Sequence, residues 1–169
     1  MWEIPSYEGN ALSHKNRVLQ LGNDLPSYDI KTFLKHIATR LPRYQEEFQQ
    51  AEKNTGISWV LLAAMSYQES KWNRHAISPT GVRGLMMLTR STAADMGIQN
   101  RLDPKNSIAG GARYLSHLYK RLPHVPDGLE RMRLALASYN VGLGHVKDAQ
   151  LLGKQLGKNP NKWNDLKDV

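Results

Sequence analysis

The segment from Trp59 to Ser70 limits most strongly what this chain can fold into, because it is apolar on nearly every side. A helix that is apolar all round has to be buried, so we expect this helix at the centre of the fold. Ser58 stands directly before it and is a favourable N-cap residue. The segment carries one carboxylate, Glu69, at its far end. These features predict a globular domain built around a buried helix that ends in an acid.

Apolar residues at helical spacing also stand on both sides of this segment. The expected helices span residues 29–41, 44–55, 91–97, 104–122, 129–139 and 146–152. Gly56 is expected to end the second of them, and Ser91 to cap the third. Asp103 followed by Pro104 is a cap with proline in the first turn of the next helix. The pattern therefore predicts a mainly α chain.

Residues 73–88 interrupt the helical pattern, because they contain Pro79, Gly81 and Gly84. They are expected to form a small hairpin or loop layer that lines a cleft. The predicted fold class is thus mainly α with a small irregular or β element (α+β). Residues 1–28 show no clear period and are interpreted as an N-terminal arm or linker, and residues 29–169 as one domain.

Composition excludes several classes of protein. The 169 residues suffice for one domain with a core, and 40% of them are hydrophobic, which excludes a disordered chain. The formal net charge of +8 suits a polyanionic partner, which the charge alone leaves open between nucleic acid, an anionic membrane surface and an acidic cell wall. The chain has no cysteine, which excludes disulfides and thiolate chemistry. No apolar stretch is long enough to span a bilayer, and the first residues lack the apolar core of a signal peptide.

Glu69 is the candidate catalytic acid. No Asp or Glu occurs from Ser70 to Ala94, so Glu69 stands alone in a mostly apolar setting before a glycine-rich turn. Burial disfavours the charged form of a carboxyl group, so we expect its pKa to lie above the roughly 4.3 of a free Glu. Most Glu side chains near a helix end are simply solvated, so this interpretation depends on the surrounding motifs.

Cleavage of a glycosidic bond needs an acid, and most glycosidases add a second carboxylate as nucleophile or base. No second carboxylate stands out in this sequence. Asp95 lies in an expected helix, Asp103 is an expected cap, and the acids at positions 46, 47 and 52 belong to a solvated helix face. Any of these acids can approach Glu69 in three dimensions, so the residues alone leave a single acid and a pair of carboxylates both open.

Three short motifs follow one another in the chain. They are Glu69-Ser70-x-Trp72, Ser78-Pro79-Thr80-Gly81-x-x-Gly84-Leu85-Met86 and Ser138-Tyr139-Asn140-Val141-Gly142. Their order and spacing resemble the lytic transglycosylase domain of bacterial cell-wall enzymes, a family that shares its lysozyme-like fold with goose-type lysozymes. The form Gly84-Leu85-Met86-Met87-Leu88-Thr89 is most similar to the membrane-bound F group of that family. The resemblance covers residues 29–163.

The resemblance implies a reaction as well as a fold. In this family a single Glu acts first as acid and then as base, while the N-acetyl group of the substrate assists at C1. The C6 hydroxyl of muramic acid then closes a 1,6-anhydro ring, and no water is consumed. The implied substrate is peptidoglycan, cleaved at the MurNAc–GlcNAc β-1,4 bond.

The resemblance also assigns roles to residues. It implies that Glu69 is the acid and base, that the Ser78 hydroxyl lines the site, and that the Tyr139 hydroxyl lies near both Glu69 and the N-acetyl group. The candidate substrate-binding residues are Tyr67, Gly84, Leu85, Met86, Met87 and Asn140. Among these, Met87 departs from the commoner Gln, and a thioether cannot donate the hydrogen bonds of an amide.

Several alternatives stay open. A hydrolytic goose-type lysozyme would need a second carboxylate near the turn, and a catalytically silent peptidoglycan-binding module would not need Glu69. The run Gly81-Val82-Arg83-Gly84 fits a nucleotide-clamping loop, but it follows an apolar helix instead of sheet-forming flanks. Four basic residues flank the motifs: Lys71, Arg74, Arg83 and Arg90. They either bind carboxylates of the peptide stems or belong to a solvated face.

We therefore expect an enzyme without cofactor or metal, since the six His residues show no metal-ligand spacing. The expected partner is the peptidoglycan strand, with no nucleic acid and no transmembrane segment in this chain, and the protein is expected to be a monomer. The resemblance implies a periplasmic location, with association to the outer membrane in a full-length protein.

Overall fold

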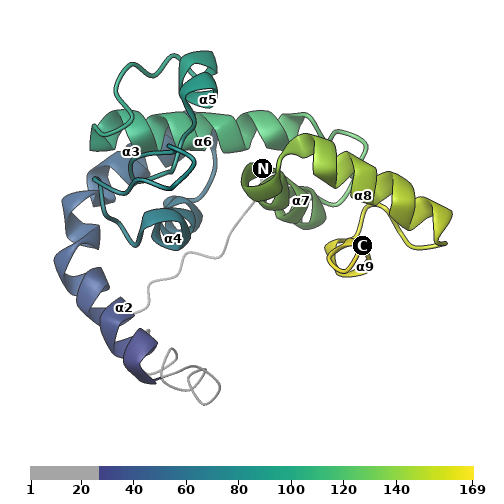
Figure 1. Ribbon diagram of the computed structural model, residues 1–169, viewed down its shortest axis with the longest axis horizontal. Helices are drawn as coiled ribbons and strands as arrows, with labels where there is room; N and C mark the ends of the chain where they lie inside the picture. Colours follow the sequence, from purple (N-terminus) through teal and green to yellow (C-terminus); the bar gives the residue numbers. More distant parts are fainter. Residues whose placement is uncertain (1–26) are drawn as a thin grey trace. The chain divides into compact units, whose positions relative to one another are not determined.

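The structure is a computed structural model that describes residues 27–169, and it is built of helices joined by loops (Figure 1). These residues fall into two compact units, one ending at Arg43 and one running from Tyr44 to Val169. The described part of the first unit holds helix α2 (Ser27–Thr39) and the short 3-10 helix η2 (Leu41–Arg43). The arm expected over residues 1–28 lies almost entirely outside the described residues.

The second unit contains the remaining helices. They are α3 (Gln45–Thr55), α4 (Trp59–Ser70), α5 (Arg90–Asp95), α6 (Pro104–Lys120), α7 (Gly128–Val141), α8 (Leu143–Gln155) and α9 (Trp163–Leu166). No regular strand occurs among the described residues, where β pairing is limited to isolated bridges. The predicted mainly α class with a small hairpin-like element is confirmed.

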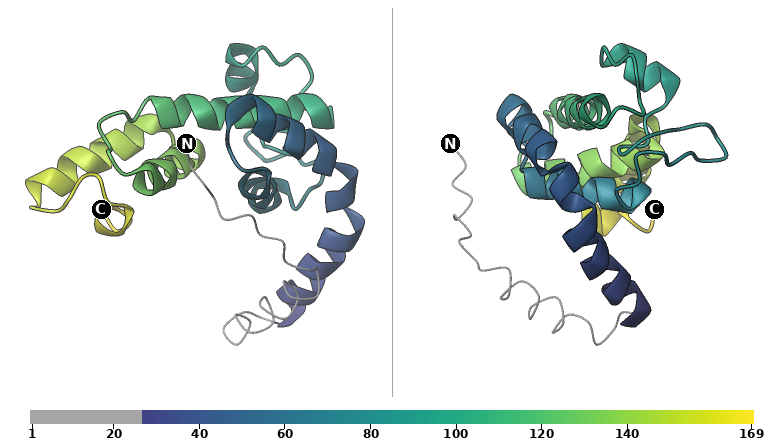
Figure 2. Two further views of the ribbon diagram at one scale, coloured as in Figure 1. Left: turned by 180° about the vertical axis from the view of Figure 1, so that it is seen from behind. Right: turned by 90° about the vertical axis from the view of Figure 1, so that its left-hand side faces the viewer.

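Helix α6 is the central helix of the second unit. It packs against α3 and α7, while α4 packs against α3 and α8 against α7 (Figures 1 and 2). Its side chains Ile108, Ala112 and Leu115 are completely buried. Asp103 caps the helix, because its carboxylate accepts a hydrogen bond from the backbone N–H of Asn106 at 2.9 Å. The expected Asp103–Pro104 start is therefore confirmed.

The prediction that α4 is buried on all sides is wrong. Leu62, Ala63 and Ser66 are buried, but Val60 is 58% exposed and Ala64 is exposed as well. Small and polar side chains alternate with the large ones along this helix, so only one face is packed. Helix α6 takes the central place that the apolar pattern had assigned to α4.

Glycines allow other parts of the chain to approach α6 closely. A Cβ on Gly111 would lie 2.7 Å from the Cβ and Cε of Met86, and a Cβ on Gly110 would lie 2.6 Å from Ile98. The segments that approach α6 here are the loop before α5 and the turn after it. The glycine pair therefore allows the loop that carries Met86 to rest directly on the central helix.

Several helix boundaries differ from the expected ones. Thr89, not Ser91, caps α5, because the Thr89 hydroxyl accepts a hydrogen bond from the N–H of Thr92 at 3.0 Å. Helix α8 begins at Leu143, directly after Gly142, and α9 was not expected at all. The N–H of Trp163, at the start of α9, donates to the Glu130 carboxylate at 2.7 Å. That contact joins residues far apart in the chain, so local sequence could not reveal it.

No helix among the described residues is both long enough and apolar enough to cross a membrane.

Candidate active site

Glu69 lies in the last turn of α4 and is half-buried. The two residues that follow Ser70 both have left-handed backbone conformations, with φ of 51° at Lys71 and 55° at Trp72. Such conformations are strained for residues other than glycine and are held only by the surrounding structure. Here the Trp72 indole is buried and donates a hydrogen bond to the Ala63 carbonyl at 2.9 Å. The turn next to Glu69 is thus fixed by a tryptophan anchored on the same helix.

Residues 76–88 form the predicted hairpin-like loop. Arg83 and Leu88 exchange both backbone hydrogen bonds, at 3.2 and 3.1 Å, and Ile77 forms a bridge with Arg83. Gly84 turns the chain with φ of 84°, and a Cβ there would lie 1.9 Å from the Arg101 carbonyl oxygen. Only glycine fits at this position, for both reasons. This loop is a compact body rather than a loose connection.

Two serines of α4 attach this loop to the helix that carries Glu69. Ser66 and Ser70 donate from their hydroxyls to the Leu85 carbonyl, at 3.0 and 2.9 Å. From the other side, the Ser107 hydroxyl of α6 accepts the N–H of Met86 at 3.2 Å. The side chains of Leu85 and Met86 are completely buried. These two residues therefore shape the site through their backbone, and a direct side-chain contact with a sugar is not open to them.

Tyr139 of α7 completes the group around Glu69. Its hydroxyl donates to the Met86 carbonyl at 2.7 Å, and its ring lies 5.3 Å from that of Tyr114 on α6. Burial raises the pKa of Tyr139, and the negative charge of Glu69 and the neighbouring Tyr114 raise it further. Tyr139 is therefore a neutral phenol at any physiological pH. Because its hydrogen is donated to Met86, its oxygen remains free to accept a hydrogen bond.

Burial raises the pKa of Glu69 above its usual value, in the direction expected from the sequence. Desolvation disfavours the carboxylate, so the acid retains its proton to higher pH than a free Glu does. Lys71 and Arg74, which would oppose this shift at close range, are exposed. The arrangement can deliver a proton to a group bound beside the turn and take one back afterwards.

Ser78 makes its hydrogen bonds inside its own loop. Its hydroxyl bonds with the Thr80 hydroxyl at 2.8 Å and accepts the N–H of Val82 at 3.2 Å. These contacts stabilise the turn that begins at Pro79, as expected for a serine in this position. The candidate role of Ser78 in lining the site stays a prediction.

The other candidate binding residues lie at different depths. Tyr67 is half-buried and packs edge-on against Trp72, with ring centroids 4.6 Å apart. Met87 is half-buried, with a left-handed backbone at φ of 46°. Asn140 is exposed at the end of α7, one residue beyond Tyr139. Their contacts with substrate stay predictions.

Sequence reasoning assigned no role to Ser66, Ser70 or Arg101, which the structure brings to this site together with Tyr114. Ser66 and Ser70 are four residues apart and share the buried face of α4 with Leu62. A polar pair on the buried face of a helix is itself a signal, since buried hydroxyls need partners. Tyr114 gave no comparable signal, because an aromatic residue at helical spacing usually belongs to the core.

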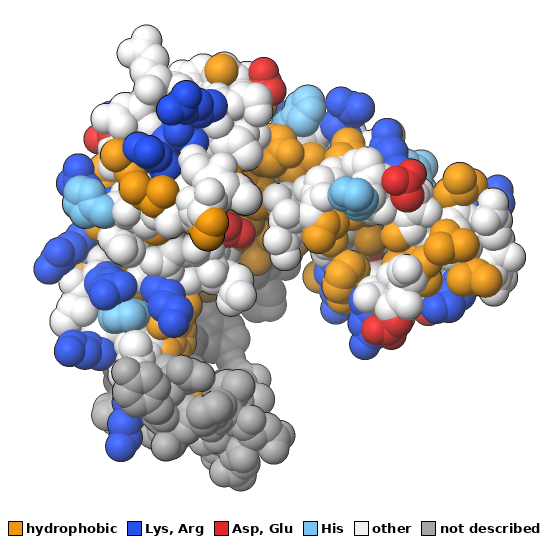
Figure 3. Space-filling model, viewed as in Figure 1, with side chains coloured by type: hydrophobic (Ala, Val, Ile, Leu, Met, Phe, Trp, Pro, Cys, Tyr) orange, Lys and Arg blue, Asp and Glu red, His pale blue; other side chains and the backbone are white. Residues whose placement is uncertain are grey.

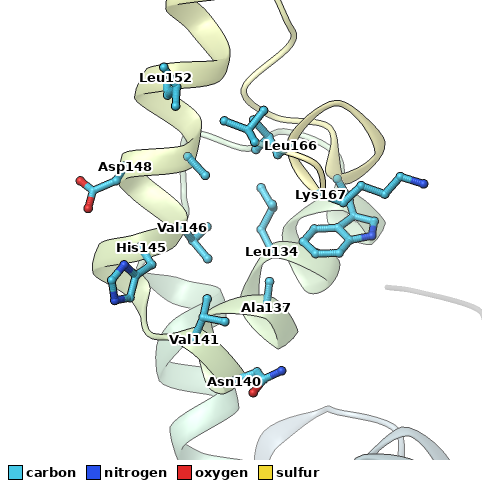
Figure 4. A pocket seen from close by; sticks show the side chains of 13 residues that line it. Leu134, Ala137, Asn140, Val141, His145, Val146, Asp148, Leu152, Leu166 and Lys167 are labelled. Carbon is cyan, nitrogen blue, oxygen red and sulfur yellow. The ribbon is translucent and has the colours of Figure 1, made fainter.

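A separate pocket of about 710 Å³ lies between α7, α8 and α9 (Figure 4). Leu134, Val146 and Leu166 turn toward its interior, and Asn140 lies at one end of it. Glu69 and Tyr139 do not line it. The pocket is therefore distinct from the group around Glu69.

Among residues 27–169 no group of three or more His, Cys, Asp or Glu side chains could hold a metal ion.

Comparison with known proteins assigns this arrangement to a family. Residues 46–162 match the transglycosylase SLT domain. Membrane-bound lytic murein transglycosylase F 1 of Alkalilimnicola ehrlichii is 53% identical over 138 residues, covering 82% of this chain and 28% of that protein. Membrane-bound lytic murein transglycosylase F of Shewanella sediminis is 55% identical over 141 residues, covering 83% of this chain and 29% of that protein.

A solved structure agrees with the sequence matches. An inactive mutant of lytic transglycosylase Slt from Pseudomonas aeruginosa superposes with a TM-score of 0.56 at 27% identity, covering 79% of this chain and 21% of that one. The chain thus spans less than a third of the length of the two relatives named above. The matched segment contains Glu69, the hairpin-like loop and Tyr139. The chain belongs to the transglycosylase SLT domain family.

Proposed function

We propose that this chain is the catalytic domain of a peptidoglycan lytic transglycosylase. It cleaves the β-1,4 bond between MurNAc and GlcNAc without water and leaves 1,6-anhydromuramic ends. The observation that carries the proposal is the half-buried Glu69, whose pKa is raised by burial, next to the buried hydroxyl of Tyr139. The family match and the names of the relatives support the same activity.

The first step transfers the Glu69 proton to the glycosidic oxygen as the bond from C1 to that oxygen breaks. The acetamido oxygen of MurNAc forms a bond to C1 at the same time, so that C1 never stands as a free cation. GlcNAc leaves with the transferred proton, and Glu69 remains as a carboxylate. Its raised pKa keeps the donor proton on Glu69 to higher pH than on a free Glu.

The second step returns the proton. The C6 hydroxyl of the same MurNAc attacks C1, the bond from C1 to the acetamido oxygen breaks, and the hydroxyl proton passes to Glu69. The acid is thereby regenerated and one carboxyl group serves both steps. Tyr139 contributes by position: its phenol oxygen, with its own hydrogen held by Met86 at 2.7 Å, accepts the amide N–H of the N-acetyl group and orients that group toward C1.

The hydrolytic alternative requires a second carboxylate that activates water. Asp95 is the acid to examine, because its charge reaches Tyr114, whose ring packs at a tilted angle against that of Tyr139. Asp95 is exposed on the short helix α5. In our proposal it takes no part in the chemistry.

The test combines product analysis with two variants. Digested murein sacculi are analysed by mass spectrometry, and wild type should yield muramic ends that lack one water relative to lysozyme products. Glu69→Gln should abolish these ends, while Asp95→Asn should yield them at close to the wild-type rate. Reducing muramic ends as the main early product of wild type would favour the hydrolytic alternative. So would the loss of product formation in Asp95→Asn.

The proposed substrate also fixes a location. Peptidoglycan lies in the cell envelope, so the domain is proposed to work in the periplasm, and the relatives are named membrane-bound. The net charge of +8 suits an acidic cell wall. We propose that the domain acts there as a monomer, which gel filtration with light scattering would test.

A further inference from the structure

Three arginines converge on the hairpin-like loop. The Arg101 guanidinium donates from Nη1 to the carbonyls of Leu88, at 2.7 Å, and Gly81, at 3.2 Å. Arg83 is bound to Leu88 through both backbone hydrogen bonds, and Arg90 begins α5 two residues after Leu88. Lys and Arg side chains gather over this part of the surface, around α5 and the loop before it (Figure 3). We call Arg83, Arg90 and Arg101 the arginine cluster.

The charges of this cluster repel one another. Desolvation lowers the pKa of Arg101, and the positive charges of Arg83 and Arg90 lower it further. Within residues 27–169, none of the three lies at ion-pair distance from a carboxylate. Like charges held together without a carboxylate partner disfavour the fold, and binding of an anionic ligand would relieve their repulsion.

The position of one member of the arginine cluster, Arg101, is fixed by hydrogen bonds. Arg101 is only partly exposed, and its two backbone acceptors fix its guanidinium under the loop. Its backbone also touches Gly84, where a Cβ would lie 1.9 Å from the Arg101 carbonyl oxygen. Arg83 and Arg90 both lie close enough to this fixed charge to act on it, and Arg90 is exposed to solvent.

The cluster also lies close to the candidate active site along the loop. Leu85 and Met86 stand between Arg83 and Leu88, and their carbonyls are held by Ser70 and Tyr139. The same few residues therefore carry the positive charge and shape the backbone beside Glu69.

The chemistry of the proposed substrate supplies the matching anion. Each MurNAc carries a peptide stem on its lactyl group, and the stem ends in free carboxylates. A planar guanidinium binds a carboxylate through two parallel hydrogen bonds, which makes arginine well suited to such a group. A strand stripped of its stems keeps only the lactyl carboxylate of each MurNAc, which lies directly on the sugar and not at the end of a peptide.

We propose that Arg83 and Arg90, supported by the fixed charge of Arg101, form a subsite for a stem-peptide carboxylate of the strand being cleaved. This inference rests on the proposed function, since it names the part of peptidoglycan that the domain selects. It assigns to the loop a role in choosing peptide-bearing strands, in addition to shaping the site beside Glu69.

The test measures selectivity between two substrates. Initial rates are recorded on peptide-bearing strands and on strands from which an amidase has removed the stems, and the ratio of the two kcat/KM values is taken. In the double variant Arg83→Gln/Arg90→Gln this ratio should fall about 5- to 20-fold, through KM on the peptide-bearing strands, as expected for loss of charge-assisted hydrogen bonds at a partly exposed site. Arg121→Gln, an exposed arginine outside the loop, is the matched control and should leave the ratio unchanged.

The outcomes separate this inference from the proposed function. An unchanged ratio in a folded, active double variant overturns the carboxylate subsite and leaves the transglycosylase proposal standing. Absence of anhydromuramic products from wild type on both substrates overturns the proposed function instead. Circular dichroism and thermal melts establish that the double variant is folded.

A second measurement excludes a general polyanion surface. Binding of a short DNA duplex is measured for wild type and for the double variant at two salt concentrations. If the double variant loses DNA binding while its substrate ratio stays unchanged, the cluster is a nucleic-acid surface and the stem-peptide proposal is wrong. A fall in the substrate ratio for the double variant supports the stem-peptide proposal.

Discussion

At the scale of single residues, the account depends on the state of one carboxyl group. Glu69→Gln retains the shape of Glu69 and removes the transferable proton. Loss of a general acid typically costs about 10²–10⁴ in rate, and Glu69 is proposed to act in both steps, so the loss should reach or exceed the upper end. Turnover of purified strands by the folded variant is the measurement, and near-wild-type turnover would remove Glu69 from the mechanism.

The pH dependence follows from the same group. Because burial raises the pKa of Glu69, the protonated form persists to higher pH than in a free Glu and is lost as pH rises through the raised value. Activity should therefore fall on the basic side at the midpoint that carboxyl NMR gives for Glu69 in the free enzyme. A usual pKa for Glu69, together with a basic limb at another pH, would point to a different acid.

The raised pKa also predicts the sign of a stability change. A carboxyl whose pKa is higher in the folded than in the unfolded state stabilises the fold at low pH, and this contribution is lost as pH rises from the unfolded to the folded pKa. Glu69→Gln, which never ionises, should therefore unfold at higher urea concentration than wild type at neutral pH. The two proteins should converge below the usual pKa of Glu. A variant less stable than wild type at neutral pH would contradict the desolvation of Glu69.

Tyr139→Phe separates positioning from proton transfer. The variant removes the donor that binds the Met86 carbonyl at 2.7 Å, and loss of a buried hydrogen bond costs about 1–3 kcal/mol. Turnover should fall less than in Glu69→Gln, because the acid remains. Urea unfolding and steady-state rates measured together check this, and unchanged values of both would show that the hydroxyl is dispensable.

At the scale of elements, the hairpin-like loop is the part that makes the site. Gly84→Ala should destabilise the protein more than Gly81→Ala. Both positions have positive φ, but a Cβ on Gly84 would lie 1.9 Å from the Arg101 carbonyl oxygen, whereas a Cβ on Gly81 would meet nothing within 4 Å. Gly81→Ala should cost about 1–2 kcal/mol for its backbone conformation alone, and Gly84→Ala clearly more. Equal costs in urea unfolding would mean that the close approach at Gly84 is not rigid.

Helices could be predicted from the sequence largely because their signals are local. Asp103 and Pro104 predict the start of α6, and Gly56 ends α3 with φ of 72°. The centre of the fold could not be predicted in the same way. The apolar composition of α4 suggested burial, but burial depends on what packs around a helix, and α6 with its glycine pair is the helix that the loop covers.

In the candidate site, too, local motifs could be read from the sequence and long-range contacts could not. Glu69, Ser78 and Tyr139 were predicted as site residues because three motifs in order resemble one family; the family is confirmed, and the roles of these residues stay predictions. The contacts that hold them, such as the two serine hydroxyls on the Leu85 carbonyl, join segments 15 and 19 residues apart. Arg101 reaches Leu88 across 13 residues and carries no motif of its own. Long-range hydrogen bonds of this kind follow from the folded backbone and not from local patterns.

At the scale of the whole molecule, the second unit by itself brings together the acid, the loop and the tyrosine. This chain spans less than a third of the two relatives compared above, and the residues proposed for the chemistry all lie in this unit. The central claim about the molecule is that it breaks a glycosidic bond without consuming water.

Digestion of peptidoglycan in water enriched in heavy oxygen tests that claim most directly. Ring closure by the C6 hydroxyl takes no atom from solvent, so the muramic ends released at early times should be anhydro ends that carry no label. Mass spectrometry of the soluble products gives the result for wild type, with a hydrolytic lysozyme digest as the labelled control. Heavy oxygen at C1 of most new muramic ends would contradict the account, because it would show that water, and not the C6 hydroxyl, attacks C1.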